Sequence, residues 1–136
     1  MTARYMLDTN ICIYLIKRQP KEVALRFEQC SVGEVVISAI TYAELQYGVA
    51  ASANPDRERI NLENLIEDIP VAPFDAAAGN AYGPIRLATR DRRADHIDKL
   101  IAAHAAALGV TIITNNVDDF ARYPGIDVEN WLTPKA

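Results

Sequence analysis

Short apolar runs of strand length alternate along this chain with longer segments of helical periodicity, and this order constrains the fold most strongly. Four runs are typical of strands, at residues 4–7, 34–38, 69–74 and 110–114, and a terminal segment at 128–131 is a fifth candidate. Parallel strands need a crossover connection, which is usually a helix. We therefore predict an α/β fold, a three-layer sandwich whose central, mostly parallel sheet has four or five strands. At 136 residues the chain is near the commonest domain size, so residues 1–136 are expected to form one domain.

Helices are expected between these runs, and residues with special backbone preferences mark their ends. Helical segments are predicted at 9–17, from 20, at 41–51, from 55, from 76, and from near 98 to 108. Asp75 is an expected N-cap, and Gly109 is an expected C-terminal cap. Gly79, Gly83 and Pro84 are poor helix formers, so we expect a kink in the helix that follows Asp75.

Composition limits the classes of function and partner. Half of the residues are hydrophobic, which is enough for a core without disulfides. With 14 Lys and Arg against 18 Asp and Glu, the net charge is -4, so the chain has no basic excess of the kind that coats nucleic acid. Cys12 and Cys30 lack CxxC spacing and follow no secretory leader, which predicts small buried residues in a cytoplasmic protein. The longest apolar tract, residues 100–113, is too short to cross a membrane.

Four acidic residues occupy places where apolar runs and turns meet. Asp8 follows the first strand, Glu44 follows the second by about one helical turn, Asp98 opens an apolar helix, and Asp119 lies just past the fourth strand. In an open α/β sheet, polar residues past the strand ends gather in the crevice where such folds bind ligands. Carboxylates forced together raise each other's pKa unless a cation compensates. Mg²⁺ or Mn²⁺ is the natural occupant, which indicates phosphoryl chemistry.

Each acid also has an ordinary alternative role. Asp8 could only cap the helix that follows it, and Glu44 could be a solvated charge on a helix surface. Asp98 could stabilise a helix N-terminus, with Asp95 as the N-cap. Asp118 competes with Asp119 for the fourth position because the two are adjacent.

The two histidines are not expected to carry the chemistry. His104 is four residues from both Leu100 and Leu108, which places it on a packed helix face. His96 has no second histidine or cysteine nearby to indicate zinc. Water can be activated by a bound metal ion without help from a histidine.

Several short segments, distributed along the chain, form one recognisable set. They are Met6-Leu7-Asp8-Thr9-Asn10, residues 38–45 with Tyr47-Gly48, residues 98–105, Thr114-Asn115-Asn116, Asp118-Asp119-Phe120, and Val128-Glu129-Asn130-Trp131. In this order they resemble the PIN-domain ribonucleases of the VapC toxin type, over nearly the whole chain. The chain departs from that pattern before the third acid, where many relatives have a Gly-containing turn and residues 93–97 read Arg-Ala-Asp-His-Ile.

This resemblance implies an Mg²⁺-dependent endoribonuclease that a cognate antitoxin inhibits and that usually forms a homodimer. It implies that the family's metal-binding and catalytic acids are Asp8, Glu44, Asp98 and Asp119. The small polar positions around the metal, which orient such carboxylates, match Thr9, Thr114 and Asn116. The implied substrate is structured or single-stranded RNA, with tRNA or rRNA as the expected target.

Two further surfaces are predicted to make contacts. One is a basic segment that contains Arg86, Arg90, Arg92 and Arg93. We expect it to contact RNA phosphates near the mouth of the site, and the alternative is a solvated helix face. Within it, Arg86 and Arg90 are expected one helical turn apart. The other consists of apolar residues in the helices at 20–30 and 55–66, which a second subunit or an antitoxin could cover.

The sequence therefore predicts a metal-dependent hydrolase that cleaves RNA phosphodiester bonds. One alternative is a metal-dependent phosphatase, although a haloacid-dehalogenase-like enzyme would need a second Asp where the chain has Asn10. Another is a catalytically silent PIN domain that serves as a binding module, which the full set of four acids disfavours. A dinucleotide site is disfavoured because no GxGxxG follows any strand.

Overall fold

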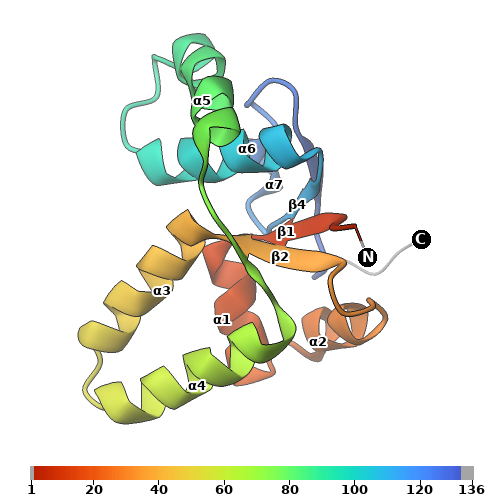
Figure 1. The fold of residues 1–136 in the computed structure, drawn as a ribbon, viewed down its shortest axis with the longest axis vertical. Coiled ribbons are helices and arrows are strands. Elements are labelled where there is room, and N and C mark those ends of the chain that lie inside the picture. The colour runs from red at the N-terminus through yellow and green to blue at the C-terminus, as the bar shows by residue number, and fades with distance from the viewer. Residues whose placement is uncertain (1, 133–136) are drawn as a thin grey trace.

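The computed structural model describes residues 2–132 and contains a central sheet of five strands (Figure 1). The strands are β1 (Tyr5–Leu7), β2 (Val35–Ser38), β3 (Val71–Ala72), β4 (Thr111–Ile113) and β5 (Asp127–Glu129). Their spatial order is β3-β2-β1-β4-β5, and every neighbouring pair is parallel. The predicted parallel α/β sheet is confirmed, with five strands rather than four.

Helices cover both faces of the sheet. They are α1 (Thr9–Lys17), α2 (Lys21–Glu28), α3 (Ala39–Ala50), α4 (Pro55–Asp68), α5 (Ala76–Ala88), α6 (His96–Leu108) and α7 (Val117–Phe120). Helices α1 to α4 lie on one side of the sheet, and α5 to α7 lie on the other (Figure 1). The predicted three-layer sandwich is therefore confirmed.

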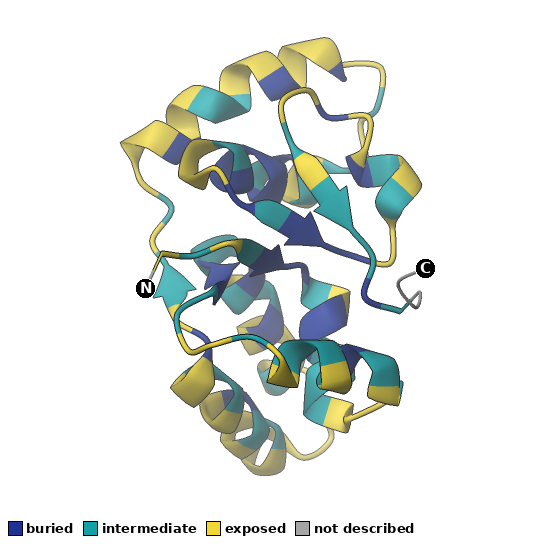
Figure 2. Cartoon of the chain, turned by 90° about the vertical axis from the view of Figure 1, so that its right-hand side faces the viewer, coloured by how far each residue is buried: buried dark blue, intermediate teal, exposed yellow. Residues whose placement is uncertain are grey.

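Alternate residues of the inner strands supply the two cores. Met6 and Ile112 pack with α5 and α6, whereas Leu7 and Ile113 pack with the helices of the opposite layer. Successive side chains of a strand point to opposite faces, so a strand covered on both sides needs a continuous apolar run. Figure 2 shows this buried centre between two helical layers whose outer surfaces are exposed.

The register of β1 aligns the strand ends that surround the site. Leu7 pairs with Ile113 of β4, and the Asp8 amide donates to the Ile113 carbonyl at 3.0 Å. On its other side β1 pairs with β2, whose last residue is Ser38. From β1 the chain adds β2 and β3 on one side and then β4 and β5 on the other. In such a sheet the change of direction at the central strand leaves a crevice at the carboxyl ends of the strands. Asp8, Ser38 and Thr114 begin the segments around this crevice.

Several predicted boundaries are wrong by a few residues. Helix α3 begins at Ala39, two residues earlier than predicted, because the Ser38 hydroxyl accepts a hydrogen bond from the Ile40 amide at 3.0 Å. Helix α6 begins at His96. Strand β3 has only two residues and is flanked by prolines, which cannot donate to a sheet. Helix α7 was not predicted, since its four residues are too few to reveal a periodicity.

The basic segment does not continue helix α5, contrary to prediction. Helix α5 ends at Ala88 with Thr89 as its C-cap, so Arg90 lies in the turn that follows and not one helical turn from Arg86. The backbone leaves the helical region at Thr89, which has φ -122° and ψ 29°. The Thr89 carbonyl accepts hydrogen bonds from the Arg92 amide at 3.0 Å and from Lys99 Nζ at 2.9 Å.

Two predicted caps and one predicted burial are confirmed. The Asp75 carboxylate accepts a hydrogen bond from the Ala78 amide at 3.1 Å, and Gly109 ends α6 in the left-handed region at φ 69°. Cys12 is fully buried, whereas Cys30 is only partly buried, and both are free thiols. Within residues 2–132 no helix combines the length and apolarity that a membrane crossing requires.

The N-cap of α5 allows a direct test of this local structure. Replacing Asp75 by alanine leaves the Ala78 amide without its acceptor, so the free energy of unfolding should fall by about 1 kcal/mol. Urea denaturation followed by circular dichroism measures this change. The matched control is Asp91→Ala, an exposed aspartate outside any helix, and equal stability of both variants would contradict the assigned cap.

Candidate functional site

Asp8 lies at the buried centre of the candidate site and also caps a helix. Its side chain is 5% exposed, and its Oδ1 accepts a hydrogen bond from the Ile11 amide at 2.9 Å. Burial is the largest cause of a raised pKa for Asp8, and the charge of Glu44 adds to it. A hydrogen bond from the Thr114 side chain partly offsets this rise. Capping is therefore a real role of Asp8, and it holds the carboxylate at the edge of the sheet.

Glu44 reaches the same region from α3, in the same helical layer as α1. It lies in the second turn of α3, beside the buried Leu45, and is itself partly buried. Its Oε1 accepts a hydrogen bond from the Thr9 hydroxyl at 2.5 Å. The donor is Thr9, the residue directly after Asp8, and its hydrogen bond holds the Glu44 carboxylate near Asp8. Glu44 is therefore not the freely solvated helix residue of its alternative role.

Asp98 experiences the combined charge of the other acids. It lies in the first turn of α6, and its pKa is raised from 3.8 to about 6. Burial is the largest cause, followed by the charges of Asp8 and Glu44, with Asp95 and Asp119 contributing as well. Asp8, Glu44 and Asp119, which are distant from Asp98 in sequence, therefore lie near enough for their charges to act on it.

The structure favours Asp119 over Asp118 as the fourth acid. The charge of Asp119 contributes to the raised pKa of Asp98. Its Oδ1 accepts a hydrogen bond from Arg92 Nη2 at 3.1 Å, so its carboxylate has a defined direction. Asp118, its neighbour in α7, is exposed.

The three small polar residues have different environments. Thr9 is hydrogen-bonded to Glu44, and Thr114 is fully buried beside Asp8, as expected for residues that orient carboxylates. Asn116 is exposed and makes no side-chain cap for α7, although its amide donates to the Thr114 hydroxyl at 2.9 Å. Thr9 and Thr114 thus contact the acids directly, whereas Asn116 acts on them only through Thr114.

The donor set fits a hard divalent cation by its chemistry. All four acids offer oxygen, the ligand that Mg²⁺ and Mn²⁺ prefer. In residues 2–132 no three Asp, Glu, His or Cys side chains are already close enough to hold a metal ion. Protein donors satisfy two of the acids instead, Thr9 on Glu44 and Arg92 on Asp119. Burial is the largest cause of the raised pKa of Asp8 and Asp98, and repulsion between the acids adds to it, which a cation between them would relieve.

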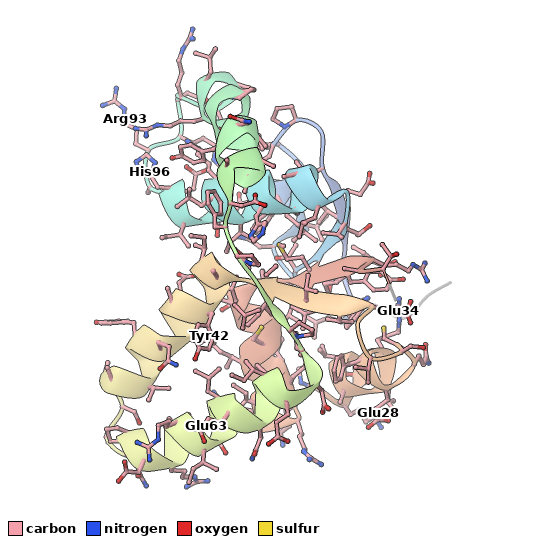
Figure 3. The ribbon with its side chains drawn as sticks, in the orientation of Figure 1. Glu28, Glu34, Tyr42, Glu63, Arg93 and His96 are labelled. Carbon is pink, nitrogen blue, oxygen red and sulfur yellow. The ribbon has the colours of Figure 1, made fainter. Side chains whose placement is uncertain are left out.

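Neither histidine is arranged as a catalytic base. His104 is 1% exposed, its Nδ1 lies 2.7 Å from the Ser38 hydroxyl, and its ring meets Phe74 edge to face. Burial lowers the pKa of His104, so the structural role predicted for it is confirmed. Leu108, expected on the same packed face, is 46% exposed instead. His96 is exposed at the start of α6 (Figure 3).

The four arginines of the basic segment do not form a uniform surface. Arg86, Arg90 and Arg93 are exposed, and Figure 3 shows Arg93 projecting outward near His96. Arg92 is partly buried and holds Asp119. Sequence reasoning also missed the partners around Arg92: Asp95 lies at the N-cap position of α6 but makes no side-chain cap. It contacts Lys99, Arg92 and the Tyr123 hydroxyl instead.

Comparisons with known proteins agree with this fold and site. Residues 5–126 match the PIN domain family. The chain is 41% identical to the tRNA(fMet)-specific endonuclease VapC of Shigella flexneri, over 94% of this chain and 98% of that protein. It is 36% identical to ribonuclease VapC2 of Haemophilus influenzae, over 95% of this chain and 98% of that protein.

Solved structures extend the similarity to three dimensions. DNA-bound VapBC from Salmonella typhimurium has a TM-score of 0.88 at 37% identity, covering 96% of this chain and 99% of that chain. VapBC2 from Rickettsia felis, bound to a DNA fragment from its promoter, has a TM-score of 0.84 at 34% identity, covering 93% of this chain and 98% of that chain. The chain therefore belongs to the PIN-domain family and, within it, to the VapC ribonucleases. The predicted family and enzyme class are confirmed.

The raised pKa of Asp98 predicts how stability depends on pH in metal-free protein. Between 3.8 and about 6 the folded state binds more protons at Asp98 than the unfolded chain does. The free energy of unfolding should therefore fall as pH rises through this window. Asp98→Asn removes this titration, so its unfolding free energy should decline less over the same range.

Urea denaturation in EDTA, at several pH values between about 4 and about 6, measures this difference. Asp118→Asn is the control and should keep the parent's slope, because Asp118 is exposed. The buried Asp8 also has a raised pKa, so part of the slope should remain in Asp98→Asn. Identical slopes for the parent and Asp98→Asn would contradict the shift.

Proposed function

We propose that this chain is the toxin of a toxin–antitoxin pair, an Mg²⁺-dependent endoribonuclease that cleaves structured RNA and is inhibited by a cognate antitoxin. The observation that supports this most is the convergence of acids from separate elements on Asp98: burial is the largest cause of its raised pKa, and the charges of Asp8, Glu44 and Asp119 add to it. That convergence occurs at the carboxyl end of the sheet in a member of a ribonuclease family.

In this proposal the metal is held by Asp8, Glu44, Asp98 and Asp119. When bound, Mg²⁺, or Mn²⁺ in its place, supplies charge stabilisation and a more acidic water molecule for phosphodiester hydrolysis. The chain's own residues set the direction of the acids. Thr9 orients Glu44, and Thr114 orients Asp8. Asp8 is buried and Asp98 is partly buried, which limits competing water and strengthens their interaction with a cation.

We propose tRNA as the substrate class, with rRNA as the alternative. A similar protein, from Shigella flexneri, is named a tRNA(fMet)-specific endonuclease. The bases would be read in a single-stranded loop, since duplex RNA hides its base edges in a narrow groove. Because the net charge is -4, recruitment of RNA depends on a local basic surface, for which Arg86, Arg90 and Arg93 are the exposed candidates.

An antitoxin and a second copy of the chain are the proposed protein partners. The VapBC structures similar to this chain are complexes from Salmonella typhimurium and Rickettsia felis. Leu25 on α2 and Ile60 on α4 are each 52% exposed, in the two helices where uncovered apolar residues were expected. Tyr47 on α3 and Leu87 on α5 are exposed as well. The free thiols Cys12 and Cys30 suit a reducing cytoplasm, where RNA and such partners meet.

The central test is the substitution Asp8→Asn. Asparagine keeps a side-chain oxygen for the Ile11 amide and is as good an N-cap as aspartate, so the fold should survive. It removes a charged metal ligand, so kcat for RNA cleavage in Mg²⁺ should fall by more than about 100-fold, beyond the loss for residues that only orient a ligand. Gel-based cleavage of tRNA measures the rate, and circular dichroism checks the fold.

The matched control is Asp118→Asn, which removes an exposed acid next to Asp119 and should retain the parent rate. Cleavage by Asp8→Asn at the parent rate would contradict the assigned site. Hydrolysis of small phosphoesters without RNA cleavage would favour the phosphatase alternative. A parent protein that neither cleaves RNA nor binds Mg²⁺ would favour a silent binding module.

A second test concerns the basic surface. The double substitution of Arg90 and Arg93 by glutamine should raise KM for RNA and leave kcat unchanged, because both residues are exposed and, unlike Arg92, form no ion pair with an acid in residues 2–132. The slope of log KM against log salt should decrease by about 1.4, that is about 0.7 for each charge removed. Lys21→Gln, on α2 in the opposite layer, is the control and should leave the slope unchanged. An unchanged slope in the double variant would remove both residues from the RNA surface.

A further inference from the structure

The segment between α5 and α6, residues 89–95, is fixed from within by a buried lysine. Lys99 is 1% exposed, and its Nζ lies 2.9 Å from the Thr89 carbonyl oxygen, 2.5 Å from the Arg92 carbonyl oxygen and 3.0 Å from Asp95 Oδ1. A buried ammonium is costly unless it is compensated, and two hydrogen bonds to carbonyl oxygens and the ion pair with Asp95 compensate this one. The segment is therefore tied to α6 at three points.

Asp95 is the centre of an arrangement that we call the loop network, which consists of Arg92, Asp95, Lys99 and Tyr123. The Tyr123 hydroxyl donates to Asp95 Oδ2 at 2.6 Å, and Arg92 Nε lies 3.6 Å from the same oxygen. The Asp95 side chain is only 9% exposed, so water screens these interactions weakly. Three partners around one buried carboxylate hold the loop in one arrangement.

Arg92 links the loop network to the acidic site. Its Nη2 donates to Asp119 Oδ1 at 3.1 Å, and its Nη1 donates to the Asp119 carbonyl oxygen at 3.2 Å. Its guanidinium carbon also lies 5.8 Å from the centre of the Tyr123 ring. Because a guanidinium presents its donors in a rigid plane, one side chain fixes both the carboxylate and the backbone of Asp119.

Asp119 needs such support more than the other acids do. Its side chain is 40% exposed, and its helix α7 has only four residues. The negative charges of Asp8, Glu44 and Asp98 favour rotation of this carboxylate toward water. Arg92 opposes that rotation while occupying Oδ1, so Oδ2 stays available to a further ligand.

We propose that Arg92 is a positioning residue that presents the Asp119 carboxylate to the metal, and that the buried loop network holds Arg92 in place for this purpose. The inference rests on the proposed function, because it assigns Arg92 a role toward the metal that the function requires. It also separates Arg92 from the exposed arginines that are proposed to contact RNA.

The substitution Arg92→Lys tests whether the planar geometry of the guanidinium matters in addition to its charge. Lysine keeps the positive charge but lacks the planar group that donates to both the carboxylate and the carbonyl of Asp119. The dissociation constant for Mn²⁺, measured by calorimetry without RNA, should rise about 10-fold. The value of kcat should fall by a similar factor, with KM for RNA unchanged. Arg122→Lys is the control, since Arg122 is exposed, lies three residues after Asp119, and should give parent values.

Parent values of Mn²⁺ affinity and kcat in Arg92→Lys would overturn this inference and leave the proposed function standing. A rise in KM for RNA without a change in kcat or Mn²⁺ affinity would also overturn the inference, because that result would indicate that Arg92 contacts RNA. A parent protein that neither binds Mn²⁺ nor cleaves RNA would overturn both proposals. If Arg92→Lys does not fold, Tyr123→Phe decides: loss of its hydroxyl from Asp95 should weaken Mn²⁺ binding, and unchanged affinity would overturn the inference.

Discussion

The parallel pairing of β1 between β2 and β4 is the constraint on which the rest of the structure depends. It places Leu7 opposite Ile113, so that the residues which follow them, Asp8 and Thr114, meet at one edge of the sheet. A shift of one residue would turn Leu7 toward the wrong helical layer, because alternate side chains face opposite cores. The packing of the two cores therefore fixes the position of the site's central carboxylate as strictly as it fixes the fold.

The acids of the site are unfavourably placed in two ways, by burial and by repulsion between their charges, and a bound cation would offset both. Burial raises the pKa of Asp8 and Asp98, and the charges of the neighbouring acids raise each further. Neutral and cationic donors partly offset these features, namely Thr9 on Glu44 and Arg92 on Asp119. Acids with raised pKa values at such a site are typical of a functional site, which agrees with the metal-binding role proposed for them.

The loop before α6 is built around a charged pair with little exposure to water. Asp95 and Lys99 form this ion pair at 3.0 Å. Removing Asp95 would leave the buried charge of Lys99 without a carboxylate partner, whereas Asp95 without Lys99 would still contact Arg92 and Tyr123. The same pair fixes the segment that carries Arg92, and thereby joins the elements that hold the third and fourth acids.

The sequence by itself determined the alternation of strands and helices, the caps at Asp75 and Gly109, and the four acids, because each follows from local periodicity or from a short motif. The tertiary structure alone decided how the acids are supported. The pairing of Arg92 with Asp119 spans 27 residues, and the contact of Tyr123 with Asp95 spans 28. Helix α5 ends before Arg90, and the carbonyl of its C-cap Thr89 accepts a hydrogen bond from Lys99 of another helix. Contacts between residues so far apart in sequence depend on how the folded elements pack against one another, so they cannot be predicted from a local sequence pattern.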